Sequence, residues 1–311
     1  MSDETEAVQE WPGPGIFEGV PEATYHALDA ASQSRLKVLD TKSPKHLRYS
    51  IDNPKESTPA LTWGSAIHDA ALLPDVFDEK YGMALQCEAI TGKGTQCSNT
   101  GSVSCDGHWY CGIKGHNPGG PADQIEVLTQ EQYESSLLIR DNIHAHPSAS
   151  FLLDCELKEL SVTWIDEATG LLCKGRFDAL SNDGTIIADI KSCRDASKIA
   201  FSKQIYDYGY HMQAAYYIQG ARAHDIPAEH FVIIAVEKAP PYEMAVYDIH
   251  AEAVDAGTQA LRPLMAQYAE CLEKNEWPGY PTKAIPITLP PYAWKQIEQR
   301  EMIRDEAELA A

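Results

Sequence analysis

Residues 176–191 read RFDALSNDGTIIADIK. The NDG step at 182–184 is a turn signal between two β-rich runs, so this stretch predicts a hairpin. Because side chains alternate along a strand, Asp189 and Lys191 project from the same face. The hairpin can bring Asp178 beside them. Two carboxylates and one ammonium group then converge on one part of the sheet.

This trio suits phosphodiester hydrolysis. Carboxylates hold a hard cation such as Mg²⁺, which polarises the phosphate and activates water, and a lysine stabilises developing negative charge. An isolated D-x-K triplet is common, however, and most often consists of ordinary surface residues. Further motifs at matching places are therefore needed to support a nuclease.

The surrounding pattern predicts an α/β domain with a mixed central sheet flanked by helices. Apolar and polar residues alternate over 157–165, which is typical of a half-buried strand. The other expected strands cover 171–180, 185–191, 231–236 and 245–249. The expected helices cover 21–50 with a break at Ser43-Pro44, 62–73, 129–146, 202–223 and 251–274.

Two earlier segments offer further ligands. GSAIH at 64–68 is a G-x-x-x-H motif, in which the glycine permits close packing and His68 can supply an imidazole to a metal. Glu159 opens the strand before the hairpin and can add a carboxylate on the same face. Glu156 competes with it for that role.

The predicted helix after the hairpin carries Gln213 and Tyr217, four residues apart and so on one face. In order, the motifs GxxxH, E, RFD, DIKS and QAAYY resemble those of the PD-(D/E)xK nucleases of the RecB, Cas4 and RecE group. This ordered set is much more specific than any one of its members. The resemblance implies a restriction-endonuclease-like core.

A closer resemblance, over roughly residues 21–294, is to RecE-like exonuclease domains of phages and prophages. The segments that carry it are Tyr25-His26, SPKH at 43–46, YGYHMQ at 208–213, WPGY at 277–280 and Leu289-Pro290.

The resemblance also implies the ligands of the catalytic metal, Mg²⁺ or Mn²⁺. These are His68, Asp178 and Asp189, with the carbonyl of Ile190 completing the site.

The remaining catalytic roles follow from the same resemblance. Lys191 becomes the catalytic lysine and Glu159 an accessory acid. Gln213 and Tyr217 become a supporting motif that positions the DNA strand or the lysine.

The relatives imply an exonuclease that digests linear double-stranded DNA from 5′ to 3′ and leaves 3′ single strands for an annealing protein. Related exonucleases form homo-oligomeric rings that thread DNA. Two alternatives stay open: an endonuclease or single-strand nuclease on the same fold, and a non-catalytic, zinc-bearing DNA or protein adaptor. Degeneration to an adaptor should have erased Asp178, Asp189 or Lys191, and all three are present.

Four of the eight cysteines crowd into one loop-rich segment. Crowding of this kind favours metal binding over disulfides in a reducing compartment. The sequences CEAITGKGTQC at 87–97 and YCGIKGH at 110–116 resemble a small zinc knuckle. We expect one structural Zn²⁺, held by Cys87, Cys97, Cys111 and His116. Cys105 or His108 could replace one of these ligands.

The formal net charge of −21 opposes a nucleic-acid partner, because phosphate binding usually shows as a basic surplus. Part of the acidic surplus lies at the ends: residues 1–15 hold four acids and no base, and residues 298–311 hold five acids and two arginines. Residues 176–222 hold six basic and five acidic residues. We therefore expect a local DNA-binding track next to the hairpin, formed by Arg194, Lys198 and Lys203.

The predicted organisation is an acidic, disordered tail over 1–15, a nuclease domain over 16–297 with a zinc-binding insertion at 86–120, and a second acidic tail over 298–311. No run of about 18 apolar residues predicts a membrane span. Residues 1–15 also lack the basic and apolar parts of a secretory signal. We expect a cytoplasmic protein, in a bacterial or phage-infected cell if the resemblance holds.

Overall fold

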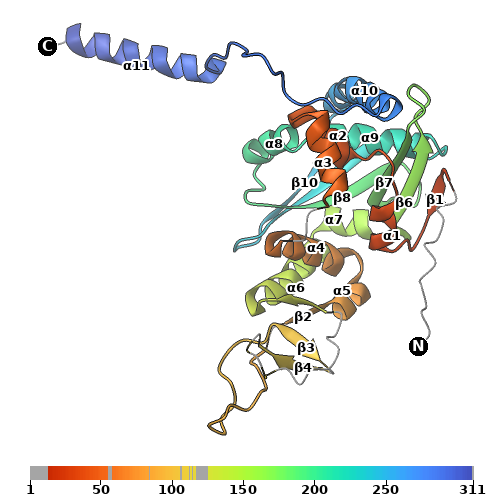
Figure 1. Ribbon diagram of the computed structural model, residues 1–311, viewed down its shortest axis with the longest axis vertical. Helices are drawn as coiled ribbons and strands as arrows, with labels where there is room; N and C mark the ends of the chain where they lie inside the picture. Colours follow the sequence, from red (N-terminus) through yellow and green to blue (C-terminus); the bar gives the residue numbers. More distant parts are fainter. Residues whose placement is uncertain are drawn as a thin grey trace. The chain divides into compact units, whose positions relative to one another are not determined.

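The computed structural model has a six-stranded mixed sheet at the centre of its first unit (Figure 1). The strand order is β1-β6-β7-β8-β9-β10, and all neighbours are antiparallel except β8 and β9, which are parallel. The strands are Gly15–Phe17 (β1), Leu157–Ile165 (β6), Leu172–Leu180 (β7), Ile186–Cys193 (β8), His230–Glu237 (β9) and Met244–Asp248 (β10). The mixed sheet and its five predicted strands are confirmed, and only the short β1 was not expected.

The structure describes residues 13–54, 58–83, 85–105, 107–111, 113, 115, 116 and 125–309. Residues 1–12 of the acidic tail predicted at 1–15 lie outside the described residues. The chain divides into two compact units, Met1–Trp277 and Pro278–Ala311.

The predicted turn between β7 and β8 forms a tight loop. Gly184 has a φ of +73°, which an L side chain rarely adopts. The Asp183 carboxylate accepts hydrogen bonds from the Ser181 hydroxyl at 2.7 Å, the Thr185 hydroxyl at 2.8 Å and the Thr185 N–H at 3.0 Å. These contacts fix the start of β8, and with it the positions of the residues further along that strand.

Helices cover both faces of the sheet (Figure 1). The core on one face includes side chains of α2 (Gln33–Thr41), α9 (Tyr210–Arg222) and α10 (Ala251–Lys274), and α10 packs against α9 and α2. The other face packs against α4 (Pro59–Leu72), α6 (Gln130–Ala145) and α7 (Pro147–Leu153). Along β8, Ile187 belongs to the first core, whereas Ala188 and Ile190 belong to the second. Each face of the sheet thus buries its own apolar core.

The helix predicted over 202–223 is two helices. The first, α8, spans Lys198–Asp207, and α9 begins after Gly209. Gly209 has a φ of +70°, and a Cβ there would lie 2.8 Å from Met212 Cε. A left-handed glycine interrupts the helical hydrogen bonding, so the direction of the chain changes just before the segment that carries Gln213.

Three prolines begin helices at the expected stops. Pro44 begins α3 (Pro44–Asp52), Pro74 begins α5 (Pro74–Lys80) and Pro147 begins α7. Proline suits the first helical turn because its missing N–H has no intrahelical acceptor there. The helices α5 and α7 were not predicted, because a proline after a helical pattern usually marks only the end of a helix. A short helix, α1 (Glu22–Ala27), precedes α2.

The predicted insertion at 86–120 is held by two small sheets. Val103–Cys105 (β3) pairs antiparallel with His108–Tyr110 (β4), and Tyr81–Met83 (β2) pairs parallel with Glu126–Leu128 (β5). The second pair joins the two ends of the insertion at the edge of α6. The insertion is thus anchored at its base by backbone hydrogen bonds.

The second unit, Pro278–Ala311, contains the helix α11 (Pro291–Leu309). The segment predicted as an acidic C-terminal tail is therefore helical as far as Leu309. Among the described residues, no helix is both long and apolar enough to span a membrane.

Candidate active site

A cleft of about 680 Å³ opens where the hairpin of β7 and β8 faces α4. Six of the predicted site residues line it: His68, Glu159, Asp178, Ile190, Lys191 and Tyr217. Asp189 and Gln213 are buried behind these residues. The cleft is therefore where the predicted chemistry would have access to a substrate.

The hairpin opens at the position of the two aspartates. β7 pairs with β8 only through Ala179↔Ala188 and Leu180↔Ile187. At the next position the Asp178 carboxylate accepts a hydrogen bond from the Ile190 N–H at 2.7 Å. The Asp178 carboxylate thus replaces the next backbone–backbone hydrogen bond between β7 and β8. Asp178 is thereby held by the backbone of β8, the strand that carries the D-x-K motif.

Glu159 lies opposite Asp178 in a local irregularity of β6. The pairing Lys158↔Ala179 is followed by Leu160↔Phe177, and Glu159 between them has a φ of +51°. A non-glycine residue rarely adopts this conformation, which costs roughly 1–3 kcal/mol. Glu159 rather than the exposed Glu156 lines the cleft. The surrounding fold therefore maintains a strained backbone that aims this carboxylate at the site.

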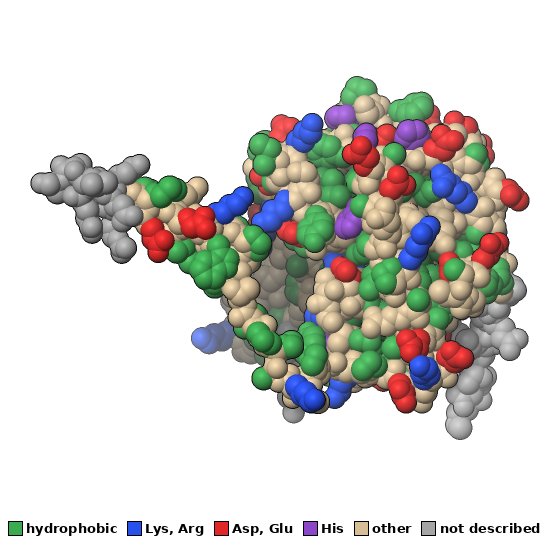
Figure 2. Space-filling view, turned by 90° about the horizontal axis from the view of Figure 1, so that it is seen from above, with side chains coloured by type: hydrophobic (Ala, Val, Ile, Leu, Met, Phe, Trp, Pro, Cys, Tyr) green, Lys and Arg blue, Asp and Glu red, His purple; other side chains and the backbone are tan. Residues whose placement is uncertain are grey.

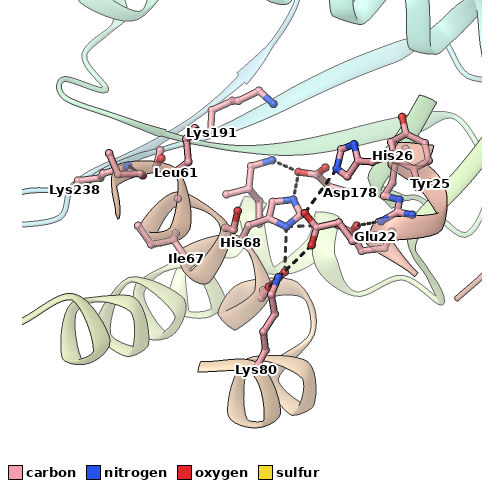
Figure 3. A pocket seen from close by; sticks show the side chains of 18 of the residues that line it. Glu22, Tyr25, His26, Leu61, Ile67, His68, Lys80, Asp178, Lys191 and Lys238 are labelled. Carbon is pink, nitrogen blue, oxygen red and sulfur yellow. Dashed lines mark hydrogen bonds and ion pairs between the residues drawn. The ribbon is translucent and has the colours of Figure 1, made fainter. Parts of the chain in front are cut away.

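His68 projects from α4 into the same cluster (Figure 3). Its Nε2 lies 2.7 Å from Asp178 Oδ2, and its Nδ1 lies 3.5 Å from Glu159 Oε1. One potential ligand atom from each of the three residues falls within 4.8 Å of the others. Residues from α4, β6 and β7, which are far apart in sequence, thus form one compact group of donors.

Burial and neighbouring charges together set the pKa values of this cluster. It raises the pKa of Glu159 to about 7, with the nearby Asp178 carboxylate adding to the shift. Burial would also raise the pKa of Asp178, but the His68 imidazole holds it below the usual value. Burial would lower the pKa of His68, yet its carboxylate neighbours keep it well above the ordinary value.

The donor set fits a divalent cation. Glu159 Oε1 is buried and, among the described residues, receives no hydrogen bond. A buried carboxylate oxygen without a donor is costly unless a cation neutralises it. Carboxylates with one imidazole are ligands that Mn²⁺ accepts, and carboxylates suit Mg²⁺.

Asp189 and Lys191 form an ion pair on the other side of the opened hairpin. Lys191 Nζ lies 2.5 Å from Asp189 Oδ2, and Gln213 Nε2 donates to Asp189 Oδ1 at 2.7 Å. Burial would lower the pKa of Lys191, but the two aspartates hold it above the usual value. Burial and the Asp178 carboxylate raise the pKa of Asp189 to about 6.

The structure therefore separates the predicted metal ligands into two groups. His68 and Asp178 are in contact, with Glu159 beside them, whereas Asp189 faces Lys191 and Gln213. Gln213 was predicted to position the DNA strand or the lysine. In the structure its amide donates a hydrogen bond to the Asp189 carboxylate instead.

Tyr217 packs into the wall of the cleft. Its ring lies 5.1 Å from that of Phe177, measured between centroids. A Cβ on Gly175 would approach Tyr217 Cε1 to 3.3 Å, so the glycine leaves room for the ring. Tyr217 thus buttresses the strand that carries Asp178.

Several residues of the cleft were not predicted. Arg176 lies 3.7 Å from Glu159 and donates to the Val20 carbonyl at 2.8 Å. Lys80 bridges Glu22 and Asp69, at 3.2 Å from each. The RFD triplet contained Arg176, but no spacing rule links residues 22, 69 and 80, which only the tertiary structure brings together.

The predicted DNA-binding residues are not all near the cleft. Arg194 lines a neighbouring groove, whereas Lys198 and Lys203 are exposed and line neither cavity. Figure 2 shows acidic side chains spread over one face of the molecule, with basic side chains lying among them. Positive charge that could attract DNA must therefore be found in a local feature.

The four predicted zinc ligands converge in the insertion. One ligand atom from each of Cys87, Cys97, Cys111 and His116 falls within 4.8 Å of the others. Cys97 Sγ lies 3.9 Å from Cys111 Sγ, and Cys111 Sγ lies 3.2 Å from His116 Nδ1.

The two alternative ligands lie outside this group. Cys105 pairs with His108 across the β3–β4 hairpin, and His108 Nδ1 contacts the Glu88 carboxylate at 2.7 Å. The structure thus brings together the preferred set of three cysteines and one histidine, without Cys105 or His108.

A family model for a PDDEXK-like domain of unknown function (DUF3799) matches residues 32–286. The chain belongs to this family. The match covers most of the chain, including the hairpin, α4 and α9, and it confirms membership of the PD-(D/E)xK nuclease superfamily and the predicted fold class. No curated protein matches the sequence.

A solved structure shares the fold. A crystal structure from Eubacterium rectale, described as "Putative exonuclease", superposes with a TM-score of 0.55 at 13% identity, over 86% of this chain and 96% of that chain. The crystal structure of SSO0001 aligns at a TM-score of 0.23 and 20% identity, over 34% of this chain and 48% of that chain, which is too weak to indicate a common fold.

Proposed function

We propose that this protein is a Mg²⁺-dependent DNA exonuclease, with Mn²⁺ as an alternative cation, that digests linear double-stranded DNA from 5′ to 3′. The observation that carries the proposal is the convergence of His68, Glu159 and Asp178 beside the Asp189–Lys191 ion pair. His68, Glu159, Asp178 and Lys191 line one cleft of a PDDEXK-like domain, and Asp189 is buried behind them.

Each of these groups has a distinct task in the proposed reaction. His68, Glu159 and Asp178 would hold the cation, with Asp189 and the Ile190 carbonyl as the further proposed ligands. When bound, the cation polarises the scissile phosphate and lowers the pKa of the attacking water. The Lys191 ammonium stays protonated beside Asp189 and can pair with the negative charge that develops on the phosphate.

Two similarities to other proteins support exonucleolytic digestion. The sequence resembles RecE-like exonucleases, and the Eubacterium rectale structure carries the description "Putative exonuclease". On this basis we propose that the products are 3′ single strands, which a single-strand annealing protein would bind. Assembly into a homo-oligomeric ring is part of the same proposal.

The test uses one linear duplex labelled at either its 5′ or its 3′ ends, beside a covalently closed circle. With Mg²⁺ we expect loss of the 5′ label as short products, 3′ label retained on long strands, and an intact circle. A chelator should stop the reaction. Cleavage of the circle would instead support an endonuclease, and no cleavage of any DNA with either cation would support a non-catalytic adaptor.

Variants connect the activity to the site. Asp178→Asn and Lys191→Met should each lower the rate by roughly 100-fold or more, because each removes charge that the transition state needs. The matched control is Lys203→Met, an exposed lysine outside the cleft. Near-normal digestion by Lys191→Met would contradict the proposed site.

We also propose that the four clustered side chains of the insertion bind one structural Zn²⁺. Three thiolates and one imidazole form a common tetrahedral zinc set. The Asn99 N–H points at Cys97 Sγ at 3.4 Å, and the Cys111 N–H points at Cys87 Sγ at 3.3 Å. Such N–H donors stabilise the charge of metal-bound thiolates, which supports a metal rather than free thiols.

A further inference from the structure

A second groove of about 790 Å³ adjoins the catalytic cleft. The two cavities share Ser192, Tyr210 and Lys238, so they lie next to each other. A Cβ on Gly64 would lie 3.7 Å from Ser192 Oγ and 3.8 Å from Lys238 Nζ. A side chain at Gly64 would thus contact both of these residues where the two cavities meet, and the glycine leaves that space free.

Three cations line this groove, and no acid does. They are Lys37, Arg194 and Lys238. Of the residues that the structure describes, no carboxylate forms an ion pair with any of the three. In a chain with a net charge of −21, an acid-free strip of three cations beside the active site is a local reversal of charge.

Partial burial disfavours the charged form of two of these cations, Lys37 and Lys238. It lowers the pKa of Lys37, with repulsion from Lys191 adding to the shift, and it lowers the pKa of Lys238. The charged form of each of these lysines is therefore less favourable here than in water. A phosphate group in the groove would stabilise the charged form.

Three aromatic rings stand among the cations. Lys37 Nζ lies 5.0 Å from the centre of the Tyr208 ring, and Lys238 Nζ lies 5.3 Å from that of Trp63. The rings of Tyr208 and Tyr210 are 5.8 Å apart, and Tyr208 is 48% exposed. Aromatic faces interleaved with cations bind unpaired nucleotides, because the bases stack on the rings while the phosphates pair with the cations.

We propose that this groove binds the DNA strand as unpaired nucleotides next to the scissile phosphate. The inference rests on the proposed nuclease function and specifies the form of its substrate at the site. A base-paired duplex keeps its bases stacked on one another and would leave the aromatic faces without a ligand. The proposal replaces Lys198 and Lys203, which lie outside the groove, with Lys37 and Lys238 as partners of Arg194.

The test measures binding without hydrolysis. Fluorescence anisotropy in EDTA compares a labelled oligothymidylate of 12 nucleotides with a blunt duplex of the same length. We expect tighter binding of the single strand, and about tenfold weaker binding of it by Tyr208→Leu, because one stacked base is lost. An oligonucleotide that carries 2-aminopurine should show fluorescence quenching with the parent protein and less quenching with Tyr208→Leu.

The salt dependence tests the cations. Three phosphate contacts on a single strand predict a slope of roughly −2 in a plot of log K against log salt concentration, and Lys37→Ala should reduce its magnitude by about 0.7. Lys198→Ala and Lys203→Ala are the matched controls and should change neither affinity nor slope. Unchanged melting temperatures would show that the variants are folded.

The outcomes separate this inference from the nuclease itself. Single-strand binding that needs Tyr208 and Lys37, in a protein that leaves DNA intact with both Mg²⁺ and Mn²⁺, would support the groove and overturn the nuclease. Efficient digestion together with unchanged binding by Tyr208→Leu and Lys37→Ala would overturn the groove. Tighter binding of the duplex, unaffected by either variant, would also overturn it.

Discussion

The Gln213 amide donates a 2.7 Å hydrogen bond to the Asp189 carboxylate, and so links α9 to the active-site strand. Both side chains are buried. The other oxygen of Asp189 contacts Lys191, so that the amide and the ammonium group together fix the orientation of this carboxylate. We therefore expect Gln213 to act as a positioning residue behind the cleft.

Gln213→Ala should weaken Mn²⁺ or Mg²⁺ binding and slow hydrolysis by roughly 10- to 100-fold, because groups that orient a metal ligand contribute about that much. Titration calorimetry with Mn²⁺ measures the affinity, and a Mg²⁺ titration of hydrolysis measures the rate. The control is Gln219→Ala on the same helix, whose amide bonds to Asp166 away from the cleft. Equal metal affinity of both variants and the parent would contradict this role of Gln213.

About one zinc per chain should copurify with the protein, and Cys111→Ser should remove it, because an incomplete ligand shell binds the metal poorly. Elemental analysis of the purified proteins gives the zinc content. Cys105→Ser is the matched control, since Cys105 lies outside the four-residue cluster and the variant should keep its zinc. Iron in place of zinc, or loss of zinc only from Cys105→Ser, would reject the assignment.

Gly257→Ala should destabilise the first unit. The helix α10 crosses α9 so closely that a Cβ at Gly257 would lie 2.2 Å from the His211 carbonyl oxygen. The backbone must shift, which we expect to lower the free energy of unfolding by roughly 1–3 kcal/mol. Thermal unfolding measures the change. Gln259→Ala, at an exposed position of the same helix, should have little effect, and equal melting temperatures of the two variants would contradict the close approach.

Asp183→Ala should lose stability in a pH-dependent way. Hydrogen bonds from the Ser181 hydroxyl and from Thr185 lower the pKa of Asp183 to about 2, whereas an aspartate in an unfolded chain titrates near 3.9. The stabilisation is therefore complete above about pH 4 and is lost as the pH falls toward 2. The difference in melting temperature between parent and variant should shrink over that range. A difference that stays constant from pH 7 to pH 3 would show that the ionised carboxylate does not contribute.

Much of the fold could be predicted from local patterns. The alternation over 157–165 and the NDG turn identified β6, β7 and β8 with errors of one or two residues, because strand periodicity and turn chemistry are properties of neighbouring residues. The long helix over 202–223 was wrong, since Gly209 does not by itself reveal a left-handed conformation. Pro74 and Pro147 directly follow the predicted ends of two helices, but each also begins a helix that was not predicted.

The sequence by itself determined the residue types of the site and their order along the chain, because motifs such as DIK and GxxxH lie within single elements. It also determined the candidate zinc ligands, which lie within thirty residues of one another. Only the tertiary structure decided which of these groups lie together. His68 and Glu159 lie beside Asp178, whereas Asp189 contacts Lys191 and Gln213. That division depends on the opening of the hairpin and on the backbone conformation of Glu159, which arise from packing between α4, α9 and the sheet. The groove has the same origin, since Lys37, Trp63 and Tyr208 lie on separate elements and no spacing along the chain relates them.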